Sequence, residues 1–268
     1  MIAKNENSLK PIGTREWYDF LGQLSDILPG MHPGGHDATE ALLEMCHLDA
    51  SSQVLDIGCG SGNTACYIAE VYGSRVYGID ISEVMIAKAN ERAKQHGLTE
   101  RLEFRVGDVF NLPFEDDWFD VVIVESVLTP LPGDKVQAMR EMVRVVRPGG
   151  LIGANEGTVD PMSPPEFMAL LEQHPATYGY FTPESLRSLF EESGLEVVEM
   201  SEAKYVDVPR PRMGLRDLVG FMIRVYPKLL LRLMRDRQIR EASKVDDELT
   251  KAGNEYMGYA LIIGQKHR

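Results

Sequence analysis

Short apolar runs alternate with helical periodicity through the middle of the chain. Five runs have the length and composition of buried strands, at 54–57, 75–79, 102–106, 120–124 and 151–154. Between them lie three segments with helical patterns, one ending near residue 72, one at 82–95 and one at about 134–146. Strands and helices that alternate in this way predict a parallel sheet covered by helices on both faces.

Cap signals mark where several helices begin. Ser82 is expected to cap the helix that follows it. The residues Asp37–Glu40 have the spacing of a capping box, with Asp37 at the N-cap position. Ser163-Pro164 and Thr182-Pro183 each predict a helix with proline at its first position.

The end of the chain departs from this alternation. Residues 195–200 and 259–263 are predicted as a sixth and a seventh strand. The stretch between them, 201–257, is too long for a hairpin and is mostly helical in periodicity. We therefore expect an N-terminal helical cap at 1–50 and a core at 51–200. A helical insert or lid at 201–257 and a last core strand at 258–268 follow.

Composition and charge limit the classes of function. The chain has 268 residues, 44% of them hydrophobic, as in ordinary globular proteins, and a net charge of −13. Such an acidic surface repels phosphates, so we expect no nucleic-acid partner. The first residues lack the apolar stretch of a signal peptide, no apolar run reaches the ~18 residues of a spanning helix, and the three cysteines form no CxxC pair. We therefore expect a soluble, cytoplasmic protein.

A glycine-rich turn, Gly58-Cys59-Gly60-Ser61-Gly62, follows the first predicted strand and precedes a helix. Glycines allow a ligand to approach the backbone closely, and open α/β sheets bind ligands at this edge. The third glycine is one place early for the dinucleotide fingerprint, because Asn63 stands there, and no Gly-Lys-Ser/Thr of a P-loop follows. Asp56, two residues before the first glycine, favours a ligand with a cationic end.

Five motifs in order resemble class I S-adenosylmethionine (SAM)-dependent methyltransferases. They are residues 56–62, 78–82, 107–109 with 112–114, 119–122 and 147–150. Within that broad family they most resemble the group that contains quinone and sterol C-methyltransferases. The resemblance implies a Rossmann-like fold with a seven-stranded, mostly parallel sheet whose last strand is antiparallel. It also implies SAM as cofactor and S-adenosylhomocysteine (SAH) as product.

The resemblance assigns roles by position. It implies that the glycine turn, with Gly58, Cys59, Gly60 and Gly62, contacts the methionine part of SAM. Asp56 and Glu125 are candidates to bind the ammonium group of SAM, and Asp80 is the candidate for the ribose. Ile81, Asp108 and Val109 are the candidates for the adenine. We interpret Cys59 as a small filler. Two alternatives stay open: Asp80 caps the following helix, or Asp108 forms a local Asx turn.

Methyl transfer needs a general base only when the acceptor must lose a proton. The candidates for this role are His32, His36 and Glu125, with Ser126, Glu156, Tyr178 and Tyr180 as further polar groups near the predicted site. His36 has a local hydrogen-bonding role as its alternative, and Glu125 has helix capping. We expect no metal site. Residues Glu125–Leu128 lack the Asn/Asp-Pro-Pro-Tyr/Phe signature of enzymes that methylate exocyclic amino groups of DNA or protein glutamine.

We expect SAM-dependent methylation of a small apolar or anionic molecule. Two alternatives remain: a SAM- or SAH-binding regulatory protein without turnover, and a cyclopropane-forming lipid enzyme.

Within the insert, residues 209–244 hold ten basic and three acidic residues beside an apolar stripe. This pattern predicts a lid packed on the acidic core, with peripheral membrane contact as the alternative. The oligomeric state is left open, a homodimer included.

Overall fold

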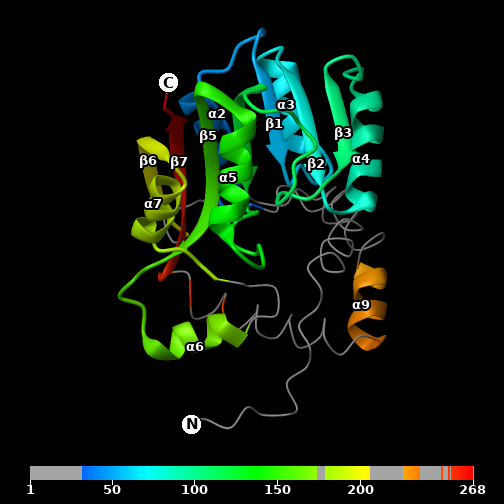
Figure 1. Ribbon diagram of the computed structural model, residues 1–268. Helices are drawn as coiled ribbons and strands as arrows, with labels where there is room; N and C mark the ends of the chain where they lie inside the picture. Colours follow the sequence, from blue (N-terminus) through cyan, green and yellow to red (C-terminus); the bar gives the residue numbers. More distant parts are fainter. Residues whose placement is uncertain are drawn as a thin grey trace.

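The computed structural model describes residues 32–173, 179–205, 226–235, 249, 253 and 255–267. Its strands form one seven-stranded sheet in the order β3-β2-β1-β4-β5-β7-β6 (Figure 1). They are β1 (Gln53–Ile57), β2 (Arg75–Asp80), β3 (Leu102–Val106), β4 (Phe119–Glu125), β5 (Val146–Val159), β6 (Leu195–Lys204) and β7 (Met257–Lys266). Strands β1 to β5 are parallel, and β7 is antiparallel to both β5 and β6. The predicted Rossmann-like fold is confirmed.

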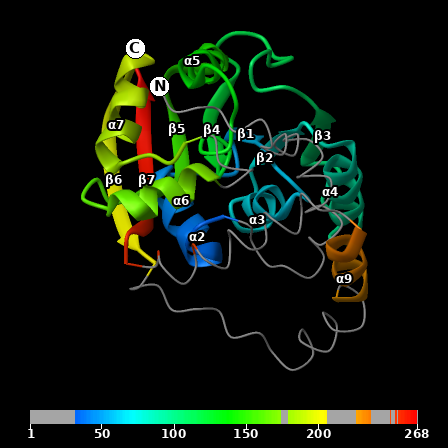
Figure 2. The same cartoon turned by 90° about the horizontal axis from the view of Figure 1, so that it is seen from below.

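Helices cover both faces of the sheet (Figure 2). The covering helices are α2 (Gly35–Met45), α3 (Asn63–Val71), α4 (Glu83–Gln95), α5 (Lys135–Val145) and α7 (Pro183–Glu192). Helices α6 (Pro165–Gln173) and α9 (Tyr226–Arg235) lie below the sheet in Figure 1. Buried residues of α2, α3 and α4 share a core cluster with Val54, whereas those of α5 and α7 share another with Leu55. Neighbouring residues of β1 thus face opposite layers, as the two-residue period of a strand requires.

The start of α2 differs from the expectation. Its N-cap is Gly34, at φ 73°, with no side-chain cap, and Asp37 lies in the first turn. Gly34 and Gly35 both take positive φ, so the chain turns into the helix earlier than the polar pattern suggests. Asp37 therefore faces the positive end of the helix dipole instead of capping it. The caps predicted at Ser82 and Thr182 are confirmed.

Strand β5 is longer than its apolar run. It begins at Val146, where α5 has just ended, and its pairing with β4 shifts register after Phe119. The segment 147–150 therefore belongs to the strand and contains its irregularity. Gly150 is required there, because a Cβ would lie 2.7 Å from the Asp120 carbonyl oxygen.

The expected insert is described only in part. Strand β6 extends to Lys204, four residues past the predicted core boundary. Helix α9 begins at Tyr226, so Pro227 stands in its first turn, where a missing N–H is tolerated. The remainder of the 209–244 segment, with its predicted lid, membrane and homodimer roles, lies outside the described residues. No helix in the described part is long and apolar enough to cross a membrane.

Candidate functional site

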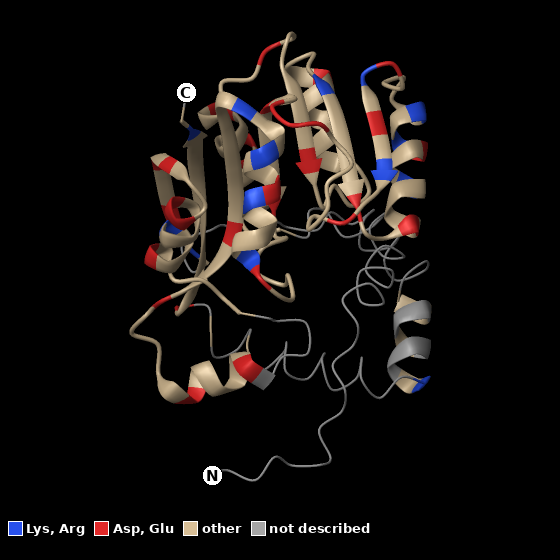
Figure 3. Ribbon diagram, in the orientation of Figure 1, with Lys and Arg blue, Asp and Glu red and all other residues tan. Residues whose placement is uncertain are grey.

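Acidic residues stand at the carboxyl ends of several strands, at one edge of the sheet (Figure 3). Asp56 lies near the end of β1, Asp80 ends β2, and Glu125 ends β4. The order of the strands places these three carboxylates on adjacent strands. Loops that follow parallel strands meet at this edge, which is where ligands bind in such sheets.

The glycine turn between β1 and α3 has positive φ at all three glycines, at 68°, 53° and 80°. A Cβ on Gly58 would overlap Val127, and one on Gly62 would lie 3.0 Å from Ala89, so these glycines serve internal packing. Gly60 differs, because its added Cβ would meet only the Gly58 carbonyl oxygen, at 4.0 Å. The open side of the turn is therefore at Gly60.

Asp80 holds this turn from the neighbouring strand. Its Oδ2 accepts a hydrogen bond from the Gly60 amide at 3.0 Å, and its Oδ1 accepts one from the Ser82 amide at 2.8 Å. The carboxylate thus joins the turn to the start of α4. A carboxylate at the end of β2, beside the open side of the turn, is placed to face a ligand bound there.

The loop after β3 lies beside Asp80. The Gly107 amide donates to the Asp80 carbonyl oxygen at 3.0 Å, and Asp108 Oδ1 accepts from the Phe110 amide at 3.0 Å. Asp108 forms an Asx turn through Oδ1, which engages one of its two carboxylate oxygens, and Val109 is buried. Ile81 is 41% exposed, which leaves an apolar side chain free beside Asp80 for a ring to pack on.

Asp56 is a buried carboxylate with an unused acceptor. The residue is 3% exposed, and its Oδ2 has no hydrogen-bond partner among the described residues. Burial raises its pKa well above the usual range, the charges of Glu125 and Asp80 raise it further, and the Ala65 amide lowers it. A buried polar atom without a partner is costly, so this site favours a donor, above all a cationic one.

Glu125 joins three segments that are distant in sequence. Its Oε1 accepts from the Thr39 hydroxyl of α2 at 2.9 Å, and its Oε2 accepts from the Thr64 hydroxyl of α3 at 2.8 Å. His32 Nδ1 lies 3.6 Å from Oε1, so the structure brings together two of the predicted catalytic residues. The Glu125 side chain is 7% exposed and that of His32 is 16% exposed.

Asn155 completes this cluster and was missed from the sequence. It is fully buried on β5, and its Nδ2 donates to the Pro33 carbonyl oxygen at 2.9 Å and to Glu125 Oε1 at 3.3 Å. Its Oδ1, like His32 Nδ1, has no hydrogen-bond partner in the part of the chain that the structure describes. Its place directly after the apolar run 151–154 is the signal that was available.

His36 is placed differently from His32. Its side chain is 61% exposed, its Nε2 lies 3.4 Å from Glu40 Oε1, and its ring meets Tyr67 edge to face. These contacts are the local role that was its alternative, although the partner is Glu40 and not Asp37. The two predicted histidines therefore stand in different surroundings, His32 beside Glu125 and His36 beside Glu40 and Tyr67.

Glu156 is fully buried and engaged in structure. It accepts from the amides of Val127, Leu128 and Thr129 at 2.8 to 2.9 Å and from the Thr129 hydroxyl at 2.7 Å. Burial raises its pKa, and these hydrogen bonds oppose that rise. Its acceptor capacity is therefore used to hold the segment that covers Gly58.

The remaining predicted groups add little to the site. Cys59 is buried, its Sγ would lie 2.9 Å from a Cβ on Gly78, and burial raises its pKa, as suits a filler. Tyr180 packs near Gly157, and Tyr178 lies outside the described residues. Within the described ranges, no group of three or more His, Cys, Asp or Glu side chains is arranged to hold a metal ion.

Comparisons with known proteins agree with this geometry. A family model described as a methyltransferase domain matches residues 48–199. The chain is 30% identical to methyltransferase GfsG of Streptomyces halstedii over 232 residues, which are 75% of this chain and 80% of that protein. It is 35% identical to 27-O-demethylrifamycin SV methyltransferase of Amycolatopsis mediterranei over 153 residues, which are 52% of this chain and 56% of that protein.

Solved structures share the fold. The [4+2]-cyclase SpnF has a TM-score of 0.76 at 23% identity and is covered over 98% of its length by 97% of this chain. A SAM-dependent methyltransferase from Thiobacillus denitrificans, solved with SAH, has a TM-score of 0.70 at 20% identity, with 92% of this chain and 97% of that chain covered. Since one of these proteins is titled a cyclase, the shared fold alone does not define the reaction.

Proposed function

The chain belongs to the class I methyltransferases that use SAM, and on this premise we propose how its residues divide the binding of cofactor and acceptor. The protein is a SAM-dependent methyltransferase of small molecules. SAM supplies a methyl group on a positively charged sulfur, so the protein must align the acceptor and, where the acceptor carries a proton, remove it.

The observation that carries the proposal is that Asp56 Oδ2, on the strand that leads into the glycine turn, has no hydrogen-bond partner among the described residues. We assign Asp56 to the ammonium group of SAM and the backbone at Gly60 to the chain next to it. Asp80, at the end of β2 and bound to the Gly60 amide, receives the ribose hydroxyls. Ile81 packs on the adenine, and Asp108 with the Val109 backbone recognises the adenine edge.

On the acceptor side, we assign His32 as the proton acceptor. One side of its ring faces Glu125 at 3.6 Å, and a carboxylate in that position stabilises the imidazolium that forms when His32 takes a proton. Glu125 is itself fixed by the Thr39 and Thr64 hydroxyls, which favours an orienting role over direct contact with SAM. His36 keeps its local role with Glu40.

We propose an acceptor that is largely apolar. The names of related proteins support this choice, since they include methyltransferases of 27-O-demethylrifamycin SV and of tocopherol and a sterol 24-C-methyltransferase. These names cover transfer to oxygen and to carbon, and another relative is an N-methyltransferase. An anionic acceptor seated by the basic 209–244 segment is the second candidate.

We place the reaction in the cytoplasm. All three cysteines, Cys46, Cys59 and Cys66, are free thiols and are buried, as suits a reducing compartment. Contact of the 209–244 segment with an anionic membrane surface is kept as an alternative to a lid.

Two measurements test the proposed function. Calorimetry should show micromolar binding of SAM and SAH but not of NAD, and Gly60→Val should lose it while remaining folded. Labelled SAM, incubated with the protein and a cell extract, should yield a labelled product that mass spectrometry identifies. Binding without transfer to any acceptor would favour a regulatory protein, and retained binding by folded Gly60→Val would place the cofactor elsewhere.

A further inference from the structure

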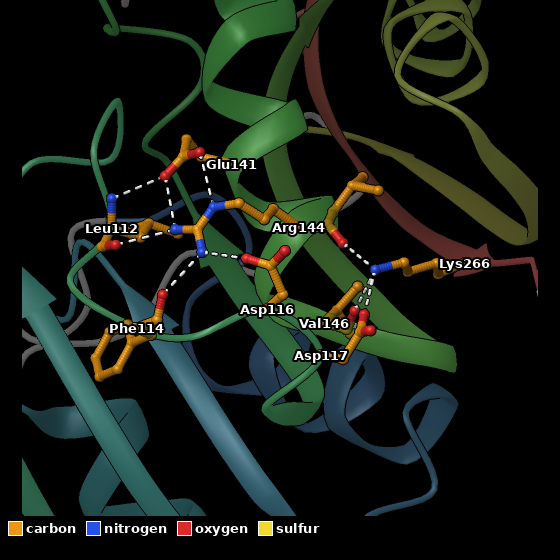
Figure 4. A network of polar contacts seen from close by, with 9 residues as sticks. Leu112, Phe114, Asp116, Asp117, Glu141, Arg144, Val146 and Lys266 are labelled. Atoms are coloured by element: carbon orange, nitrogen blue, oxygen red, sulfur yellow. Dashed lines mark hydrogen bonds and ion pairs between the residues drawn. The ribbon is translucent and has the colours of Figure 1, made fainter.

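Arg144, on α5, fastens the loop that joins β3 to β4 (Figure 4). Its Nε and Nη2 donate to the two oxygens of Glu141, both at 2.9 Å. Nη2 also donates to the Leu112 carbonyl oxygen at 3.0 Å, and Nη1 donates to the Phe114 carbonyl oxygen at 2.8 Å and to Asp116 Oδ1 at 2.9 Å. A guanidinium has five N–H donors, and here all five are used.

Glu141 extends this contact to the other side of the same loop residue. Its Oε2 accepts from the Leu112 amide at 3.0 Å. The ion pair therefore holds both the N–H and the C=O of Leu112. The hydrogen bonds from Arg144 lower the pKa of Glu141, so the pair stays charged. Hydrogen bonds to charged partners are stronger than neutral ones.

The segment fastened in this way is short and carries the adenine-side residues. The Asn111 amide donates to the Asp108 carbonyl oxygen at 3.0 Å, which folds residues 108–111 into a turn next to Leu112. At its other end, the Gly107 amide is bound to the Asp80 carbonyl oxygen. Val109 and Leu112 are buried, at 7% and 3% exposure. The loop is therefore bound to β2 at Gly107 and to α5 at Leu112.

We propose that Arg144 and Glu141 are positioning residues for adenine recognition, because they hold the 108–112 backbone in the conformation that reads the adenine edge. This inference rests on the proposed function, which places the adenine at Asp108 and Val109. A loop that is ordered before binding does not lose that freedom when the ligand arrives, so a fixed backbone gains both affinity and selectivity.

The chain offers a matched control at the other end of the same loop. Lys266 Nζ, on β7, donates to Asp117 Oδ1 at 2.6 Å and to the carbonyl oxygens of Val143 and Val146 at 2.8 Å (Figure 4). Its side chain is 21% exposed, close to the 29% of Arg144. Replacement of Lys266 therefore disrupts a similar polar network against the same helix without touching Leu112.

The experiment compares Arg144→Met, Arg144→Lys and Lys266→Met with the unaltered protein. Calorimetry measures binding of SAH and of S-inosylhomocysteine, which carries oxygen in place of the adenine amino group. We expect Arg144→Met to weaken SAH binding about tenfold, which corresponds to the loss of one hydrogen bond to a charged group. The affinity for S-inosylhomocysteine should change less than twofold. Lys266→Met should leave the ratio of the two affinities unchanged. Amide hydrogen exchange without ligand should be faster at 109–114 in Arg144→Met alone.

The outcomes separate this inference from the proposed function. Failure of the unaltered protein to bind SAH would overturn both. The positioning role alone would be overturned if Arg144→Met bound SAH with an unchanged ratio of SAH affinity to S-inosylhomocysteine affinity. It would also be overturned if Lys266→Met lowered this ratio as much as Arg144→Met does. If Arg144→Met fails to fold, Arg144→Lys gives the same test, because a single ammonium keeps the charge but loses the planar fork; an unchanged ratio there would likewise overturn the inference.

Discussion

The carboxyl edge of the sheet is built in two different ways. On the half formed by β1 to β3, polar groups are held by neighbours in sequence or by the adjacent strand, as when Asp108 binds the amide two residues later. On the half formed by β4, β5 and α2, the contacts of Glu125 to Thr39 and Thr64 span 86 and 61 residues, and that of Asn155 to Pro33 spans 122. The first half is a local motif, whereas the second exists only after the chain has folded.

The two halves also differ in how their carboxylates are used. Asp56 keeps one oxygen without a partner among the described residues, Glu125 receives two hydroxyls, and Glu156 receives four donors. A carboxylate with unused lone pairs is available to a ligand, and one with four donors is part of the framework. The predictions below test this division, from the largest expected effect to the smallest.

Replacement of His32 should have the largest effect, because it removes the proposed proton acceptor. We expect His32→Gln to lower kcat by about 10²–10⁴-fold with an acceptor that must lose a proton. Affinity for SAM should change less than twofold, since the role belongs to the acceptor half. Steady-state kinetics and calorimetry measure both quantities.

His36→Gln is the matched control for this variant. His36 lies four residues away but is exposed and paired with Glu40. We expect its kcat to stay within about twofold of the unaltered protein, because a surface contact of this kind contributes little. Equal losses in the two variants, or none in His32→Gln, would remove His32 from the reaction.

Glu156→Ala should lower the stability of the fold, because Glu156 belongs to the framework and not to the reacting groups. The variant leaves three backbone amides and a hydroxyl without their acceptor. The free energy of unfolding should therefore fall by about 3–5 kcal/mol, as when one partner of a buried charged network is removed. Denaturant titration measures this loss, and Glu156→Gln should recover part of it because an amide oxygen still accepts. A stable Glu156→Ala protein that lacks only activity would show that Glu156 acts in the reaction.

Much of the first half could be predicted from the sequence, because its signals are local. The glycines, Asp56 and Asp80 stand at fixed spacings from apolar runs, and the structure places them on β1, β2 and the turn between β1 and α3. The roles of Asp108 and Ile81 came from the resemblance to the methyltransferase family. The start of helix α2 was displaced by three residues, from a predicted N-cap at Asp37 to Gly34, because backbone freedom at Gly34 outweighed the polar pattern at Asp37.

The second half could be predicted only as separate candidates. Glu125 and His32 were found as polar residues near expected loops, but nothing in the sequence placed them side by side. Thr39 lies in a helical pattern, where a threonine on the buried face gives no sign of its partner. A contact between positions that are 86 residues apart depends on the docking of α2 against the sheet, and that docking is a property of the packed core.

Asp56→Asn should separate ligand binding from stability. The amide removes the charge that we assign to the SAM ammonium, so SAM affinity should fall by about 1.5–3 kcal/mol. Burial raises the pKa of Asp56 in the folded protein. The folded protein therefore binds a proton that the unfolded chain releases, and the contribution of this group to stability falls as pH rises above the unfolded pKa of about 3.9.

The pH dependence gives the control for Asp56. The difference in unfolding free energy between Asp56→Asn and the unaltered protein should grow in favour of the variant between pH 4 and the folded pKa, in the absence of ligand. Subtraction of the two curves removes the contribution of Glu156, which both proteins share. A difference that is constant with pH would show that Asp56 is ionised in the folded protein before any ligand binds.

Thr39→Val should have the smallest effect and is the most direct test of how the second half is assembled. The variant keeps the shape of a buried side chain but removes one donor to Glu125, which should cost about 1 kcal/mol of stability. Glu125 keeps the Thr64 hydroxyl, so the carboxylate should shift without becoming free, and kcat should fall by about tenfold or less. If both hydroxyls fix the same carboxylate, the double variant with Thr64→Val should lose more activity than the two single losses combined. Thr39→Ser, which retains the hydroxyl, should keep its kcat. Additive losses in the double variant would mean that the two threonines act separately, with Thr39 acting through His32, whose Nε2 lies 3.4 Å from the Thr39 hydroxyl.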